Sequence, residues 1–510
     1  MKKIIMLSCL SIGLVVGATS AQAADLWQVY QQALKSDPTF QAALATQMSV
    51  AEETPQARAV LLPQLSGDAS AAYSRVLTKS DNVLIGGISQ GPSRSTVRSR
   101  VTDFGLTLKQ NVFNFSNWMK LGEARDDVKA ASATYNAASQ DLMQRVASAY
   151  FAVLQAEDVL RATGAEKKAY WEEYVQAEQR FKVGVSTITD VDNAKAYYDT
   201  SIADYVQAEN AVQNAREDLR AITGESYDSL DTLKPVIPLV TPSPNFIDRW
   251  VDTALQQNWQ LVAARYTSMS AHNKVYEMRG GHLPTVDASL NYDNSLTRNY
   301  RNLGVTRNRG PTGEVDVSVP IFSGGMVTSQ VRQALADYEK ALQDQEAKSR
   351  QVIDSTRKSY LGVESSIATV KAQKQVTISN RSSLEGMEAG YHVGTRTMVD
   401  VLNAQRQLYD SEKDYAIARY TYANGIVGLK QSAGTLSAND IQEMNTWLIS
   451  PQNDVQKASP PTKTVSLKKN KTITKKSTAI SAKSQKNTAK KPVKTHRSIQ
   501  YRKKTVGVKR

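Results

Sequence analysis

The sequence predicts a chain of mixed α and β structure that contains two copies of one structural plan. Three observations support this prediction. Phrases recur at a fixed separation, two pairs of segments alternate between apolar and polar residues, and two long proline-free stretches show helical spacing. We therefore expect each copy to contain a pair of β-strands followed by long helices.

One phrase occurs twice, as FKVGVSTITDVDNAKAYYD at 181–199 and as YHVGTRTMVDVLNAQRQLYD at 391–410. The glycines of the two copies, Gly184 and Gly394, are 210 residues apart, and so are the aspartates that follow them. A separation shared by several matches indicates an internal duplication.

Nearer the N-terminus the separation changes. The Leu-Pro pair at 62–63 matches the pair at 283–284 at a distance of 221 residues, so the first copy has extra residues after this point. A length difference confined to one place is typical of an exposed loop. We predict repeat 1 over 24–235 and repeat 2 over 236–450.

The first 23 residues have the three parts of a secretory signal sequence. Lys2 and Lys3 precede an apolar run at 4–16, and Ala-Gln-Ala at 21–23 provides the small-x-small cleavage site. The alternative, an N-terminal anchor helix, is disfavoured because the run is too short to span a bilayer. Cys9 is the only cysteine, so the mature chain is expected to hold neither a disulfide nor a cysteine-ligated zinc.

The end of the chain differs in charge from the rest. The net charge is +14, yet 457–510 alone contains 18 Lys and Arg residues and no Asp or Glu, so the preceding part is mildly acidic. Because large apolar residues are scarce there, we predict that the tail at 451–510 is disordered. Its charge also suits an anionic envelope polymer or lipid phosphate, and we expect no nucleic-acid partner for an exported chain.

Alternating segments predict one β-hairpin in each copy, within 64–113 and within 285–322. In the first of these, Leu65, Ala69 and Tyr73 alternate with polar neighbours. A period of two indicates strands with one apolar and one polar face. Such strands suit either a half-buried sheet in water or the wall of a membrane barrel.

If the four strands lie in a membrane, one chain is not enough. Four strands cannot close a barrel, and an open sheet edge cannot face lipid. Membrane barrels begin at about 8 strands, so at least two chains must combine, and a trimer would give 12 strands.

The rest of each copy is predicted to be helical. In 128–160, apolar residues recur every three or four positions and form one narrow seam along a helix. We expect long helices to 225 in repeat 1 and to 434 in repeat 2. A helix over 116–183 would be about 100 Å long at 1.5 Å per residue. A helix of this length suits a protein that crosses a gap.

Seven motifs occur in a fixed order over 25–440. They are LWQVYQQAL (26–34), LLPQL (61–65), AYF (149–151), RFKVGVSTITDVDNA (180–194), GHLPT (281–285), PIFSGGMVTSQVRQA (320–334) and MEAGYHVGTRTMVDVLNA (387–404). Together they resemble the TolC-type family of outer-membrane efflux and secretion channels. The resemblance implies a homotrimer, in which four β-strands per protomer form a 12-stranded transmembrane barrel that continues as a long periplasmic α-helical barrel.

The resemblance also implies a function and partners. The trimer would be a passive exit duct for tripartite drug efflux, type I protein secretion or both. It would lie in the cell outer membrane, extend into the periplasm, and work with a periplasmic adaptor (membrane fusion) protein and an inner-membrane pump. No cofactor is implied.

In this family the duct closes at the periplasmic helix tips, where both copies of the repeated phrase fall. The resemblance assigns the helix-tip turns to Gly184 and Gly394. It also implies a latch between neighbouring hairpins, in which Tyr391 and Arg396 of one bind a Thr-Asp pair of the other.

The Thr-Asp pair corresponds to Thr189 and Asp190. Arg396 has no acidic neighbour in its own loop, and Asp190 can accept charge-assisted hydrogen bonds. The alternative is an exposed charge pair that contributes little free energy.

The family also places two aspartates, three residues apart, around the pore constriction. This chain has Asp400 at the first position and Asn403 at the second. A trimer would then present three carboxylates in place of six. Such a ring still favours cations, but with a weaker hold on multivalent ones.

Two other classes of protein share some of these features. The four histidines, at 272, 282, 392 and 496, show no HExxH spacing, and the glycines form neither GxGxxG nor GxSxG, so we predict that the chain is not an enzyme. A periplasmic coiled-coil adaptor without a pore would explain the helices. It would not need the four alternating strands.

Overall fold

The computed structural model describes residues 23–81, 83–85, 88–300 and 304–450. Apart from Ala23, the predicted signal sequence lies outside these residues, and so does the predicted basic tail at 451–510. The described chain combines helices and strands, which confirms the predicted mixed class. The division into two repeats remains a prediction.

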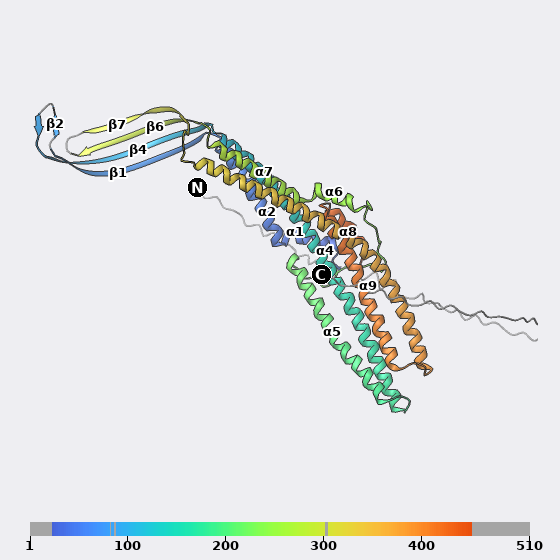
Figure 1. The fold of residues 1–510 in the computed structure, drawn as a ribbon. Helices are drawn as coiled ribbons and strands as arrows, with labels where there is room; N and C mark the ends of the chain where they lie inside the picture. The colour runs from blue at the N-terminus through green and yellow to red at the C-terminus, as the bar shows by residue number, and fades with distance from the viewer. Residues whose placement is uncertain (1–22, 82, 86–87, 301–303, 451–510) are drawn as a thin grey trace, which may run out of the picture. The chain divides into compact units, whose positions relative to one another are not determined.

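Long helices account for most of the described chain (Figure 1). Those before the middle of the chain are α1 (Leu26–Ser36), α2 (Pro38–Ala51), α3 (Glu53–Ala59), α4 (Phe115–Lys182) and α5 (Ile188–Thr223). Those after it are α6 (Ile247–Gln257), α7 (Trp259–Gly280), α8 (Met326–His392), α9 (Met398–Ser432) and α10 (Ala438–Asn445). Helices α4 and α8 have 68 and 67 residues, so each is about 100 Å long.

Four strands form one antiparallel sheet in the order β1-β4-β6-β7, which leaves β1 and β7 at its edges. They are β1 (Gln64–Ser80), β4 (Ser93–Phe113), β6 (Thr285–Tyr300) and β7 (Val305–Ser318). The pairing of β4 with β6 joins the two hairpins. Two short pairs were not predicted, β2 (Val83–Ile85) with β3 (Ile88–Gln90) and β5 (Thr232–Leu233) with β8 (Leu448–Ile449).

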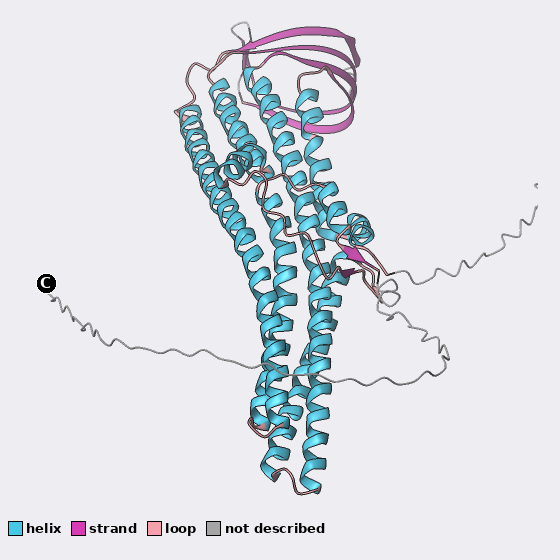
Figure 2. Ribbon diagram, turned by 90° about the vertical axis from the view of Figure 1, so that its right-hand side faces the viewer, coloured by secondary structure: helices cyan, strands magenta, loops and turns pink. Residues whose placement is uncertain are grey.

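Strand β4 leads almost directly into α4, since β4 ends at Phe113 and α4 begins at Phe115, whereas a short loop separates β7 from α8. Helix α4 packs along α5, α7 and α9, and α8 packs along α7 and α9. The α4–α5 and α8–α9 turns lie at the end of the helices away from the sheet (Figure 2). In the part of the chain that the structure describes, no helix combines the length and apolar character needed to cross a membrane.

The helix pairs that precede the two hairpins are built alike. Asp37 ends α1 and caps α2, and Asn258, 221 residues later, ends α6 and caps α7. The two residues share nearly the same backbone conformation, with φ −65° in both and ψ of 115° and 117°. Asp and Asn at this position satisfy backbone N–H groups that the first helical turn leaves free.

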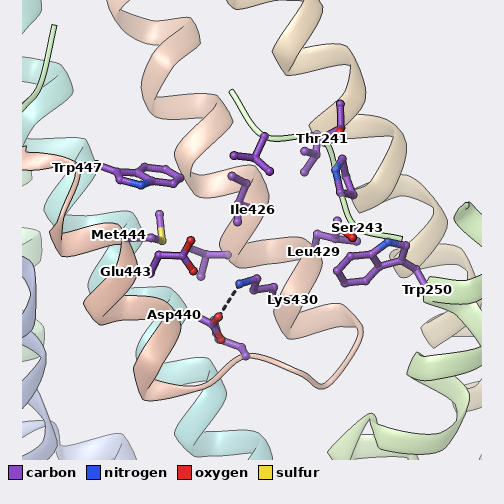
Figure 3. A pocket seen from close by; sticks show the side chains of 15 residues that line it. Thr241, Ser243, Trp250, Ile426, Leu429, Lys430, Asp440, Glu443, Met444 and Trp447 are labelled. Carbon is purple, nitrogen blue, oxygen red and sulfur yellow. Dashed lines mark hydrogen bonds and ion pairs between the residues drawn. The ribbon is translucent and has the colours of Figure 1, made fainter. Parts of the chain in front are cut away.

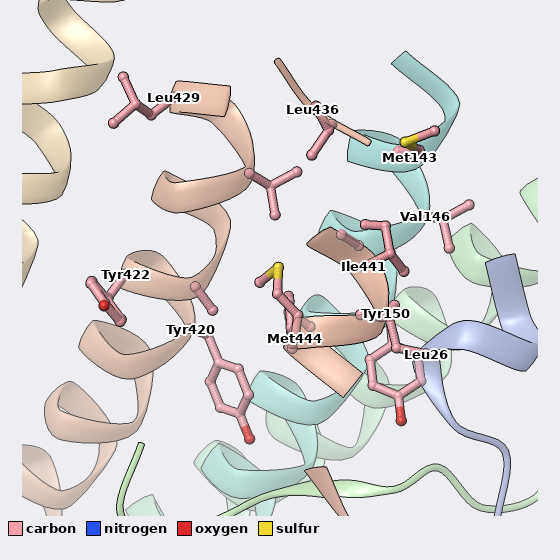
Figure 4. Close-up of a cluster of buried hydrophobic side chains, with 14 of the residues drawn as sticks. Leu26, Met143, Val146, Tyr150, Tyr420, Tyr422, Leu429, Leu436, Ile441 and Met444 are labelled. Carbon is pink, nitrogen blue, oxygen red and sulfur yellow. The ribbon is translucent and has the colours of Figure 1, made fainter. Parts of the chain in front are cut away.

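The main core lies where α4 and α9 meet α1, α10 and the linker after α5 (Figure 4). Three of its tyrosines are almost fully buried, and each hydroxyl has a partner. Tyr150 donates to the carbonyl of Asp231 at 2.9 Å, Tyr420 donates to the Asp158 carboxylate at 2.7 Å, and Tyr422 accepts from a backbone N–H at 2.7 Å. These bonds remove the cost of burying polar groups. Those of Tyr150 and Tyr422 fix the linker against the long helices, and that of Tyr420 joins α9 to α4.

Candidate functional site at the helix tips

The two tips of the long helices are built by the same turn. Gly184 follows α4 and Gly394 follows α8, with φ of 78° and 79°. These values lie in the left-handed region, which glycine adopts without steric cost. In each tip the residue after the glycine donates its N–H to the carbonyl five residues earlier, at 2.9 Å. This is the Schellman arrangement that ends many helices.

The repeated aspartates cap the helices that return from the tips. The carboxylate of Asp190 accepts hydrogen bonds from Thr187 and from the Ser186 hydroxyl, the latter at 2.8 Å. The carboxylate of Asp400 accepts from the backbone and hydroxyl of Thr397, at 2.9 and 2.8 Å. Both Thr-x-x-Asp segments form capping boxes, so the shared phrase encodes the start of a helix in both copies.

Both aspartates are held in the charged form. Hydrogen bonds from Thr397 place the pKa of Asp400 below its ordinary value. For Asp190, burial raises the pKa. Hydrogen bonds from Ser186 and Thr187 and the positive charge of Arg180 together lower the pKa by more than burial raises it, so it is also below the ordinary value.

The helix pairs α4–α5 and α8–α9 each form a helical hairpin that ends in one of these tips, and at the tips the word hairpin refers to these helix pairs. Tyr391 lies between the two helical hairpins of one chain. Its ring is half-buried, and the guanidinium carbon of Arg180, on α4, lies 4.7 Å from the ring centroid. Burial raises the pKa of the Tyr391 hydroxyl, opposed by the charge of Arg180 and supported by that of Asp190. A cation over a tyrosine face at this distance is attractive.

Arg396 and Thr189 are both exposed. Among the described residues of this single chain, no hydrogen bond or ion pair joins Arg396 to Thr189 or Asp190. The aliphatic part of Arg396 lies over Gly390, where an added Cβ would come 2.7 Å from the Arg396 Cγ. A side chain at position 390 would therefore displace Arg396.

Asn403 is directed toward the first hairpin of its own chain. Its Oδ1 accepts a hydrogen bond from the hydroxyl of Tyr197, on α5, at 2.8 Å. Beside it, Met398 and Leu402 of α9 belong to a buried cluster that also contains Val191, from α5. The two tips of one chain therefore share a small apolar core.

Sequence reasoning missed three of the residues that join the hairpins, namely Arg180, Tyr197 and Glu173. The Glu173 carboxylate accepts a hydrogen bond from Gln405 at 3.3 Å, and its pKa is raised, mainly by burial. A difference between the two repeats could have drawn attention to Arg180. Position 180 is Arg in the first copy and glycine, Gly390, in the second, so the two tips differ there.

A separate cavity of about 210 Å³ lies near the main core (Figure 3). Its wall is mostly apolar and includes Trp250, Trp447 and Ile426. The Lys430 ammonium pairs with the Asp440 carboxylate at 2.5 Å beside it. Within the described ranges, no group of three or more His, Cys, Asp or Glu residues is placed to hold a metal ion.

Comparisons with known proteins agree with the fold and with these motifs. The family model described as outer membrane efflux protein matches residues 29–225 and 250–435. The chain is 37% identical to outer membrane protein TolC of Vibrio cholerae over 451 residues, which covers 88% of this chain and 99% of the relative. It is 36% identical to outer membrane protein TolC of Escherichia coli, with 86% and 88% covered.

Two more distant similarities extend this result. The proteases secretion protein PrtF of Dickeya chrysanthemi is 25% identical, with 86% of this chain and 94% of that protein covered. The solved outer-membrane channel OprN matches with a TM-score of 0.68 at 19% identity, covering 82% of this chain and 93% of that one. The family resemblance and the outer-membrane location predicted from the sequence are thereby confirmed: the chain belongs to the outer membrane efflux protein family, as a TolC-type member located in the outer membrane.

Proposed function

We propose that three copies of this chain form one outer-membrane duct, with twelve strands closed into a barrel and the long helices continuing it through the periplasm. The observation that carries the proposal is the four-stranded sheet with two open edges, β1 and β7. These edge strands have 17 and 14 residues. Edges of this length carry many unpaired backbone N–H and C=O groups, which cannot face lipid. The edge strands of neighbouring copies supply the missing hydrogen-bond partners.

The two faces of the sheet support a lipid-exposed wall. Residues directly opposite each other on paired strands share a face, and Leu65, Leu108 and Leu290 form one such row. We call the face with these three leucines the apolar face. We call the opposite one, which contains Asp68, the acidic face. In a closed barrel the apolar face turns outward to lipid and the acidic face lines the channel.

The length of the helices supports a tunnel that reaches away from the membrane. Helices α4 and α8 each extend about 100 Å from the sheet to the tips. Because the strands lie in the outer membrane, the tips lie deep in the periplasm. An adaptor protein and an inner-membrane pump are the partners that such tips would meet, and drugs, secreted polypeptides or both are the cargo.

The tips are the proposed gate. Arg396 is exposed, and Asp190 keeps its charge because its pKa is low. We propose that Arg396 and Tyr391 bind Thr189 and Asp190 of the neighbouring hairpin and so hold the duct closed. The three copies of Asp400 form a ring of three carboxylates at the constriction. Asn403, three residues further along α9, takes the second ring position without a charge.

Recording from a planar lipid bilayer tests this function. The purified full chain is expected to give discrete single channels with a low resting conductance. A periplasmic adaptor with the same helices would give none. Absence of channels from a preparation that retains its helical circular dichroism would refute the proposed duct.

A further inference from the structure

The charged residues of the sheet are sorted by face. Every Asp and Glu of strands β1, β4, β6 and β7 lies on the acidic face, as the pairings of Asp68, Asp103 and Asp293 illustrate. All Lys and Arg residues of these strands lie on the apolar face, except Lys109. Cationic side chains that face hydrocarbon are costly in free energy unless an anionic partner neutralises them. The position of these Lys and Arg residues on the apolar face therefore requires such a partner.

These cations gather at one end of the apolar face and stand directly opposite one another. The register pairs Arg75 with Arg98, Lys79 with Arg94, and Arg100 with Arg298. We call these six residues the cationic band. Directly opposed side chains on one face lie about 5 Å apart at Cβ, and like charges at that distance repel.

The rest of the sheet does not neutralise the cationic band. All six of its side chains are exposed, and none forms an ion pair within the described chain. Strand β7 adds Arg307 and Arg309 on the same face. The carboxylates of the sheet point to the opposite side. An external anion is therefore the remaining source of compensation.

The position of the band along the strand fixes the kind of anion. Arg75 follows Leu65 by ten residues, which is about 33 Å of strand. With a tilt of about 40°, this corresponds to about 25 Å along the membrane normal, the height of the apolar belt of an outer-membrane barrel. The helices leave from the other end of the sheet, so the cationic band stands where the outer leaflet's hydrocarbon ends.

We propose that the cationic band binds phosphate groups of outer-leaflet lipid. Arginine presents two N–H groups in a plane to a phosphate, and two opposed arginines can share one dianion. Phosphate bound in this way removes the repulsion within each pair and anchors the barrel at its outer rim. The proposal rests on the proposed function, because it requires the apolar face to be turned to lipid.

The test uses the detergent-solubilised full chain and diphosphoryl lipid A as the probe, with bound lipid counted by native mass spectrometry. The Arg98→Gln/Arg100→Gln variant removes two charges of the band. Each basic residue near an anionic surface contributes about fivefold in affinity, so removal of two should raise the dissociation constant roughly 30-fold. The matched control, Lys109→Gln/Lys195→Gln, removes two exposed cations outside the band and should bind as the natural chain does.

Two further probes identify the ligand. Dephosphorylated lipid A should bind about as weakly as diphosphoryl lipid A binds to Arg98→Gln/Arg100→Gln, and inorganic phosphate should not compete at equal concentration. Equal affinity of the two lipids, or equal loss in the band variant and the control, would overturn the proposal. Single-channel conductance is recorded on the same samples. If the band variant forms channels and binds lipid as tightly as the natural chain does, only the lipid-binding proposal is wrong. If the natural chain forms no channels, the proposed duct is wrong.

Discussion

The hydroxyl of Tyr197 donates a hydrogen bond to Oδ1 of Asn403 across 2.8 Å and so joins α5 to α9 within one chain. Around this bond, Met398 and Leu402 pack against the first hairpin. The two tips of one protomer are therefore linked by a polar contact inside an apolar setting, where an unpaired amide oxygen is costly. A movement that separates the hairpins must break this contact.

Removing either end of this bond should loosen the tip. Tyr197→Phe and Asn403→Leu each delete one partner, at a cost of about 1 kcal/mol, and each should raise the resting conductance in a planar bilayer. Because both variants break the same bond, the double variant should be little worse than either one.

Tyr205→Phe is the matched control, because this α5 tyrosine has no hydroxyl hydrogen bond within the described residues. It should leave the conductance unchanged. Fully additive effects of the Tyr197 and Asn403 changes would show that the two residues act independently.

The carboxylate ring should give a partial block by trivalent cations. Three charges around the axis bind such a cation less tightly than six. We expect incomplete block in the natural channel, loss of block in Asp400→Asn, and stronger block in Asn403→Asp. Asparagine at position 400 keeps an acceptor for the Thr397 cap, so this variant removes charge without removing the start of α9. Complete block in Asp400→Asn would exclude the ring.

The latch should respond to changes on both of its sides. Arg396→Ala and Asp190→Asn each remove a charged partner, so the resting conductance should rise severalfold in both. Asparagine again keeps the capping acceptor of α5. The control is Asp192→Asn, which neutralises an exposed aspartate two residues further along. A latch is excluded if the resting conductance stays that of the natural channel in both variants.

Several local features could be predicted from the sequence because they depend on neighbouring residues. Alternation predicted the two β-hairpins, and apolar spacing in a proline-free stretch predicted α4. The matching proline-free stretch of the second copy predicted α8, although its apolar seam is less regular. Thr187 and Asp190 form a Thr-x-x-Asp pattern that predicts a capped helix start, whereas the family resemblance implies only a latch role for Asp190. A capping carboxylate still has lone pairs for a second partner, so the two roles are compatible.

Contacts between distant segments could not be predicted in the same way. The bond from Tyr197 to Asn403 depends on how α5 turns toward α9, and the stacking of Arg180 on Tyr391 depends on the angle between two hairpins. Neither angle is encoded by periodicity, which fixes only the buried face of each helix. The pair β5–β8 escaped prediction because two-residue strands show no alternation.

Two carboxyl groups and a lysine near the start of α4 make part of the stability pH-dependent. Lys274 Nζ lies 2.6 Å from Oε2 of Glu277 and 3.4 Å from Oε2 of Glu123. Burial and then the hydrogen bond with Glu277 raise the pKa of Glu123 from 4.5 to about 7, against the effect of Lys274.

Between these two pKa values the folded chain binds a proton at Glu123 that the unfolded chain has lost, so the free energy of unfolding falls as pH rises from about 4.5 to about 7. Glu123→Gln should flatten this slope in unfolding curves measured at several pH values. Glu364→Gln, an exposed change on α8, should not. An unchanged slope in Glu123→Gln would assign the dependence to another group.

The most direct measurement is disulfide cross-linking across the two open edges of the sheet. Ala71→Cys on β1 is combined in turn with Cys at 311, 313 or 315 on β7, because these positions share the apolar face. In membranes, one of the three double variants should form a covalent product of three chains and nothing larger. The single variants should form none. A largest product of two chains, a ladder beyond three, or no product with any of the three partners would contradict a barrel closed by three copies.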